Sequence, residues 1–117
     1  MKVFLTGDRS LPPQVSYLAA LVAFQDLAQV HPDLTPEDVL TGDLGGFESA
    51  VRFLLPGVRV VESTVGPDGK PDLDARHGEA IKDADECWVF HPDPLDSRVY
   101  ASAAKFWDDE GLQVVTL

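Results

Sequence analysis

The sequence contains a single cysteine, Cys87, in 117 residues. A lone thiol excludes a disulfide within the chain, and it excludes zinc sites built from several cysteines. Cys87 begins the apolar run 87–90, so we expect a buried and unreactive side chain. The three histidines are scattered without the spacing of metal ligands. We therefore predict neither a metal site nor a cofactor.

Long hydrophobic runs are also missing. The segment 1–5 is apolar, but the polar residues 6–9 follow it at once. A membrane-spanning helix needs about 20 apolar residues, and no signal-peptide pattern is visible. We therefore expect a cytoplasmic protein that does not contact a membrane.

Basic residues are scarce, with nine lysines and arginines against twenty acidic residues and a formal net charge of −11. This charge repels phosphate backbones, so we expect no nucleic-acid partner. It does not exclude one small anionic ligand, because a local group of arginines and backbone amides can outweigh a distant negative field.

The chain does contain a regular alternation of short apolar runs and segments with helical periodicity. Strands that alternate with helices at this spacing imply right-handed crossovers and a parallel sheet. We predict one α/β domain over residues 1–117, a three-layer Rossmann-like domain with a mostly parallel five-stranded sheet. The expected strands are 2–6, 38–41, 58–61, 86–91 and 112–117, and the expected helices lie between Ser10 and Pro32 and over 47–55, 73–84 and 97–110.

Two helix ends carry recognisable signals. Ser10 is a candidate cap for the first helix, with Pro12 and Pro13 tolerated in its first turn. Gly111 is a candidate cap for the end of the fourth helix. The segment 63–72, which contains two glycines and two prolines, is expected to be a mobile loop.

In such sheets ligands bind beyond the carboxyl ends of the strands, near the point where the strand order reverses. The first loop there is Thr6–Ser10 (TGDRS). Gly7 permits a sharp turn, the start of the next helix offers free amides for a phosphate, and Arg9 can add a bidentate contact. The alternative is a plain strand-to-helix turn, with Ser10 as the cap and Arg9 in solvent.

The second loop, Gly42–Glu48 (GDLGGFE), places three glycines before a helix. It lacks both the dinucleotide fingerprint and the lysine of a phosphate-binding P-loop. The glycines either approach a ligand or only let the helix pack close to the sheet.

These two loops resemble the SLOG superfamily, which includes DprA-like proteins, LOG-like proteins and the small YspA-type domains. Thr6–Ser10 is similar to the opening motif of that group. Gly42–Glu48 matches the length of the second YspA-type motif and keeps Gly42, Gly46 and the final acid, but Asp43 replaces a glycine and Gly45 an arginine.

Two shorter stretches extend the resemblance over nearly the whole chain. Arg76 and His77, with Ala80 and 84–85, are similar to a third family motif whose asparagine and methionine are replaced here. Of a fourth motif at the start of the last helix, only Ser97–Arg98 remains.

The resemblance implies a Rossmann-like sheet that binds a nucleotide or a nucleotide-derived ligand, often as a sensor. Some branches of the superfamily cleave the base from a nucleotide monophosphate, using a glycine-rich motif and a glutamate. Here the segment 91–94 (HPDP) occupies the comparable loop, without those glycines. The resemblance also implies that Arg9, Arg76 and Arg98 gather around one crevice, where they would suit a phosphorylated ligand.

Acidic residues and histidines near these loops complete the candidate site. Asp8, Asp43 and Glu48 can accept hydrogen bonds from ribose hydroxyls. Glu48 is the candidate general base if it faces the crevice, and otherwise an acid favoured in the first turn of a helix. His77 belongs either to the core or to the site, and His91 stands at a strand end where it can contact a ligand. The predicted ligand-binding residues are Thr6, Gly7, Asp8, Arg9, Ser10, Gly42, Asp43, Gly45, Gly46, Arg76, His77, His91, Ser97 and Arg98.

Three functions are consistent with the sequence. The favoured one is a module that binds or senses a small nucleotide-like ligand without catalysis. The alternative is a hydrolase acting on a nucleotide, with Glu48 as the base. The third is an interaction protein that kept the fold and lost the pocket. The exposed parts of the first and fourth helices are candidates for contact between two copies, so a homodimer is consistent with the sequence.

Overall fold

The five apolar runs form one parallel sheet in the order β3-β2-β1-β4-β5. The computed structural model describes all residues 1–117, and the predicted α/β Rossmann-like architecture with three layers is confirmed. Each strand lies within one residue of its expected range. The strands are β1 (Val3–Gly7), β2 (Val39–Gly42), β3 (Arg59–Val61), β4 (Glu86–His91) and β5 (Leu112–Thr116), and the helices are α1 (Pro13–Val30), α2 (Phe47–Leu54), α3 (Leu73–Ala80) and α4 (Arg98–Ala103), with short 3₁₀ turns at Pro36–Asp38 and Pro94–Asp96.

Strand β1 lies at the centre of the sheet and is buried along its whole length. From β1 the chain builds outward on one side to β2 and β3, and then returns to add β4 and β5 on the other side. The strand order therefore reverses between β1 and β4, whose C-terminal residues Gly7 and Phe90 are register partners. The carboxyl ends of these two strands are where the ligand rule predicts a crevice.

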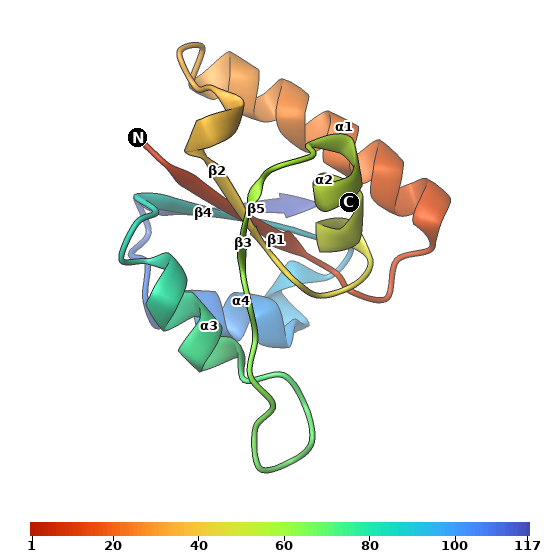
Figure 1. The fold of residues 1–117 in the computed structure, drawn as a ribbon, viewed down its shortest axis with the longest axis vertical. Coiled ribbons are helices and arrows are strands. Elements are labelled where there is room, and N and C mark those ends of the chain that lie inside the picture. The colour runs from red at the N-terminus through yellow and green to blue at the C-terminus, as the bar shows by residue number, and fades with distance from the viewer.

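The helices cover the sheet on both faces, as the near-continuous apolar strands require. Figure 1 shows α1 and α2 on one face of the sheet and α3 and α4 on the other. Residues alternate along β1, so that Val3 and Leu5 join the core under α1 and α2, whereas Phe4 joins the core under α3 and α4. Cys87 is buried in the second core, and burial raises the pKa of its thiol.

Two expectations about helix ends are wrong. The N-cap position of α1 is Pro12, without a side-chain cap, and the Ser10 hydroxyl instead donates to Asp8 Oδ1 at 2.6 Å. The fourth helix does not continue to residue 110, because α4 ends at Ala103 and hydrogen-bonded turns follow. Gly111 therefore caps no helix and sits in the turn that leads into β5, where its N–H bonds to Asp108.

None of the helices combines the length and the apolar character that a membrane span requires.

Candidate functional site

A cleft of about 240 Å³ opens at the point where the strand order reverses. The loop after β1 forms one wall and the segment from the end of β4 to the start of α4 forms another. Six residues predicted from the sequence meet here, namely Asp8, Arg9, Ser10, His91, Ser97 and Arg98. The remaining lining residues are Leu44, Pro71, Leu73, Asp96 and Val99.

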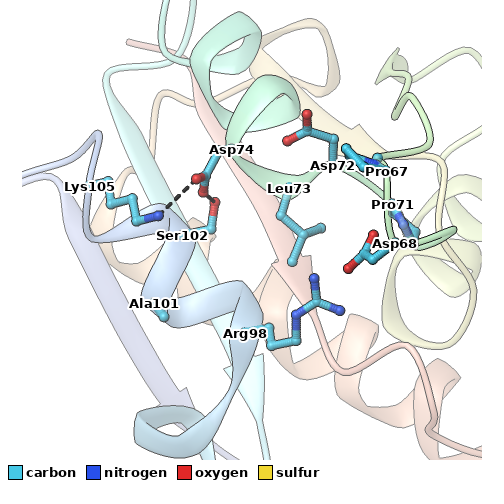
Figure 2. Close-up of a pocket in the computed structure, with 11 residues that line it drawn as sticks. Pro67, Asp68, Pro71, Asp72, Leu73, Asp74, Arg98, Ala101, Ser102 and Lys105 are labelled. Carbon is cyan, nitrogen blue, oxygen red and sulfur yellow. Dashed lines mark hydrogen bonds and ion pairs between the residues drawn. The ribbon is translucent and has the colours of Figure 1, made fainter.

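Arg9 and Arg98 supply the positive charge of the cleft. Both residues are exposed, they come from opposite walls, and neither belongs to any of the six ion pairs in the molecule. In Figure 2 the guanidinium of Arg98 points into open space beside Leu73. A guanidinium without a protein partner retains all its N–H donors for a ligand, and its planar fork suits a phosphate or a carboxylate.

Two carboxylates and a histidine line the same cleft. Asp8 is held by Ser10, whose N–H donates to Oδ1 at 2.8 Å. The Asp8 Oδ2 atom faces His91 Nε2 at 3.9 Å. Because His91 Nδ1 accepts a hydrogen bond from the N–H of Asp93, a neutral His91 ring carries its proton on Nε2. With Asp96 on the opposite wall, the cleft presents two cations, two carboxylates and an imidazole N–H.

A wider groove of about 540 Å³ continues from the cleft. The two spaces share Pro71, Leu73 and Arg98, so the guanidinium of Arg98 can be approached from both. The groove lies between the loop 66–72 and α4. At its far end Asp74 accepts hydrogen bonds from Lys105 and Ser102, and these bonds lower the pKa of the Asp74 carboxyl (Figure 2).

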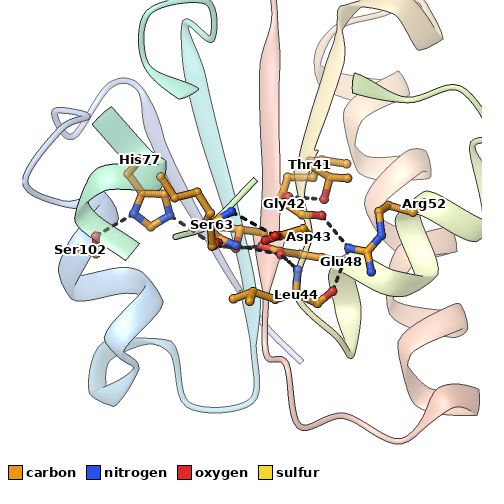
Figure 3. Close-up of polar contacts among 12 residues, drawn as sticks. Thr41, Gly42, Asp43, Leu44, Glu48, Arg52, Ser63, His77 and Ser102 are labelled. Carbon is orange, nitrogen blue, oxygen red and sulfur yellow. Dashed lines mark hydrogen bonds and ion pairs between the residues drawn. The ribbon is translucent and has the colours of Figure 1, made fainter. Parts of the chain in front are cut away.

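Arg76 and Glu48 do not line the cleft, which corrects two expectations. Both side chains are fully buried, and Arg76 Nη1 donates to Glu48 Oε1 at 2.8 Å. Thr6 lies between them: its hydroxyl donates to Glu48 Oε2 at 2.6 Å and accepts from Arg76 Nη2 at 3.0 Å. The Glu48 carboxylate also accepts the N–H of Leu44 (Figure 3). A carboxylate enclosed in this way is not available as a general base to a ligand in the cleft.

His77 also belongs to the interior. The ring is fully buried, and its Nδ1 lies 2.8 Å from the Ser102 hydroxyl (Figure 3). That hydroxyl donates to Asp74 (Figure 2). Desolvation, reinforced by the charge of Arg76, lowers the pKa of His77 to about 3. The ring is therefore neutral, and its Nδ1–H donates to Ser102. The core role left open by the sequence is the one observed.

Two of the three glycines of the second loop, Gly42 and Gly46, serve packing. A Cβ on Gly42 would collide with Arg76 Nη1 and Glu48 Oε1, so this glycine leaves room for the buried ion pair. Gly46 has a φ of 64°, in the left-handed region, and a Cβ there would collide with the carbonyl oxygen of Asp8. Asp43 and Gly45 are exposed, and Asp43 accepts the N–H of Ser63 rather than facing the cleft. The packing alternative describes this loop.

The start of α1 offers fewer amides than expected. Pro12 and Pro13 have no N–H, and the Ser16 N–H is used within the helix. Neither proline lines the cleft. The positive charge of this cleft therefore comes from the arginine side chains more than from the start of α1.

Five residues that line the cleft were not predicted from the sequence, namely Leu44, Pro71, Leu73, Asp96 and Val99. Pro71 and Leu73 come from the segment that was expected to be a mobile loop and from the start of α3. Asp96 stands directly before the motif residues Ser97 and Arg98, and its position next to them was the only available signal. No three His, Cys, Asp or Glu side chains gather in a way that could hold a metal ion.

Searches against family models, curated proteins and solved structures found no match to this chain.

Proposed function

We propose that this domain binds a small phosphorylated nucleotide or nucleotide-derived ligand in the cleft between β1 and β4, as a binding or sensing module. The observation that carries the proposal is the pair Arg9 and Arg98. The two guanidiniums lack protein partners and line one cleft at the reversal of strand order. In a protein of net charge −11, keeping two arginines unpaired at one place is best explained by an anionic ligand.

The rest of the lining supports a nucleotide over a bare phosphate. Asp8 and Asp96 add acceptors that suit ribose hydroxyls, and His91 adds an N–H donor. Pro71, Leu73 and Val99 are apolar and can cover one face of a base. Ligand pockets usually measure about 300–1,000 Å³, and the cleft reaches that range only together with the adjoining groove.

Binding is favoured over hydrolysis because the candidate base is enclosed. Glu48 would have to leave Arg76 and Thr6 to reach a ligand, and the buried Arg76 charge would then lose its counter-ion. An interaction protein that had lost its pocket is not favoured either. The cleft is open, and its two arginines have no protein partner.

Isothermal titration calorimetry tests the proposal with AMP, ADP-ribose and NAD as probes. We expect at least one of them to bind the wild-type chain. The double variant Arg9→Ala, Arg98→Ala should bind that ligand at least about 100-fold more weakly, because each lost charge-assisted contact costs roughly tenfold or more. The control Arg59→Ala, Lys82→Ala removes the same charge from two surface ion pairs outside the cleft and should bind normally.

Two results would refute the proposal: no heat from any probe at millimolar concentration, or equal binding by the double variant and the wild type.

A further inference from the structure

The outer face of α1 is apolar and uncovered. Val15, Leu18, Leu21 and Val22 project from it with 44–65% of their surface exposed. These positions follow the helical repeat, so they form one stripe. In Figure 1 the helix lies at the outside of the molecule, and no other element covers its outer side.

The stripe continues onto the neighbouring helix α2. Phe53 is 67% exposed, and its ring packs against the Tyr17 ring of α1 at a centroid distance of 5.3 Å. A short rim of uncharged residues, including Gln14, Gln25 and Ser49, surrounds the apolar centre. We call the set Val15, Leu18, Leu21, Val22 and Phe53 the α1 patch.

The α1 patch is also the least charged part of the helical surface. In the 18 residues of α1 the only charged side chain is Asp26, and α2 adds the buried Glu48 and the half-buried Arg52. The opposite layer of α3 and α4 carries exposed charges such as Asp74, Glu79 and Arg98. Charge is thus sparse on the face where these apolar groups gather, with Asp26 at its edge, although a quarter of the chain is charged.

We propose that the α1 patch is the interface of a homodimer in which α1 packs antiparallel against α1 of a second copy. The two copies meet on the same surface of each, as a two-fold axis requires. An axis passing near residue 20 places Leu18 of each copy against Val22 of the other, and Val15 against Gln25. The proposal is independent of the ligand-binding function.

Charge favours a second copy over other partners. Each copy carries −11, so two copies repel unless they meet where charge is absent, and the α1 patch offers that place. In the antiparallel arrangement the two Asp26 residues lie about 18 Å apart along the helix axis, from a rise of 1.5 Å per residue. This separation exceeds the screening length of about 8 Å at physiological salt. An acidic partner would find no countercharge in the α1 patch, and a basic partner would find only Asp26 at its edge.

The area is sufficient for association. A large apolar residue has a solvent-accessible area on the order of 150–200 Å² when fully exposed. With the exposed fractions of its five residues, the α1 patch exposes roughly 500 Å² of surface. That value is at the upper end for the largest apolar patch of a monomer. Together with the uncharged rim it approaches the roughly 800 Å² per partner of a stable interface. The cleft uses the carboxyl ends of the strands, so dimerisation leaves it open.

Sedimentation velocity of the full chain tests the interface between about 1 and 100 µM protein. We expect a species of twice the 12.7 kDa chain mass, whose population rises with protein concentration and with salt, because salt screens the net repulsion. Leu18→Glu should weaken dimerisation at least about 100-fold, since it would bury an unpaired carboxylate in each copy. The matched control Val65→Glu adds the same charge at an equally apolar site that is 73% exposed outside the patch, and it should remain dimeric.

Circular dichroism shows whether each variant is folded, and Leu18→Ala, which adds no charge, should weaken the dimer about tenfold as a milder second test. A folded wild type that stays monomeric at 100 µM would overturn the proposal, and so would a Leu18→Glu chain that dimerises like the wild type. A monomer that instead binds neutral lipid vesicles through the α1 patch would assign that surface to a membrane and also overturn it.

Discussion

The most heavily constrained side chain in the molecule is Arg76, because a guanidinium that is fully buried must replace all the water it has lost. Glu48 supplies the countercharge and Thr6 supplies a hydroxyl acceptor. The Nε–H of Arg76 has no hydrogen-bond partner, whereas the ring of Phe4 lies 5.5 Å below the guanidinium carbon. Removing one partner of such a buried ion pair is strongly destabilising, because the other charge is then left buried without a counter-ion.

At this scale we predict that Glu48→Gln destabilises the fold by about 3–5 kcal/mol, because the buried Arg76 charge loses its counter-ion. Urea unfolding followed by circular dichroism measures the change. Glu79→Gln serves as the control, since Glu79 pairs with Lys82 on the surface and its loss should leave stability unchanged.

If Glu48 were a catalytic group facing the cleft, Glu48→Gln would instead leave stability intact and alter the ligand site. Unchanged stability in this variant would therefore contradict the structural role assigned to the pair. We expect ligand affinity in the folded variant to stay within about threefold of wild type, because the carboxylate does not line the cleft.

At the scale of elements, the turn from β2 into α2 fits tightly around the ion pair. Gly42 leaves no space for a side chain, whereas a Cβ on Gly45 would meet nothing closer than 3.7 Å. We predict that Gly42→Ala destabilises the fold by about 1–3 kcal/mol through overpacking. Gly45→Ala should change stability by less than about 0.5 kcal/mol or be slightly stabilising.

Thermal unfolding of the two glycine variants provides the comparison. Equal effects of Gly42→Ala and Gly45→Ala would show that the turn is not packed as described.

Helices α3 and α4 are joined through His77, and this contact gives stability a pH dependence. The pKa of His77 is about 3 in the folded state and about 6.5 when unfolded, because burial and Arg76 both disfavour the imidazolium. Below pH 6.5 the unfolded chain binds a proton that the folded chain does not, so stability falls as pH falls.

We predict a loss of about 1.4 kcal/mol per pH unit between pH 6 and 5, before most carboxylates begin to titrate. Chemical unfolding of the wild type and of His77→Gln at a series of pH values measures the slopes. The dependence of the unfolding free energy on pH should be weaker in the glutamine variant by the contribution of His77. His31 and His91 are present in both proteins, so they do not affect the difference. Parallel curves for the two proteins would contradict the placement of a neutral, buried ring.

The helices and strands were predictable where the local pattern of apolar residues determines them. Short apolar runs such as 87–90, bounded by polar residues and a proline, favour strands, since both faces of a parallel strand are buried. The end of α4 was not predictable, because the sequence of residues 104–110 is compatible with a helix, whereas these residues form hydrogen-bonded turns. Ser10 is not the cap because α1 begins at Pro13, two residues later than a Ser10 cap requires, and the Ser10 hydroxyl bonds to Asp8 instead.

On the scale of the whole molecule, topology determined which predicted residues meet. Arg9 and Arg98, which the resemblance and the ligand rule led us to expect beside one crevice, line the same cleft although they are 89 positions apart in the chain. The resemblance placed Arg76 at the crevice, and the sequence left Glu48 and His77 open between the site and the interior, but all three side chains are buried. Burial depends on how helices lie against a sheet, and periodicity reports that only approximately.

The most direct test of the account is a titration of the ¹⁵N-labelled chain with the nucleotide probe that gives the strongest calorimetric signal, followed by amide chemical shifts. We expect the shift changes to concentrate on residues 8–11 after β1 and 93–99 around the start of α4, with smaller changes at 71–73. Changes confined to other surfaces, or an absence of changes at saturating nucleotide, would contradict the claim that the two free arginines form an anion-binding cleft.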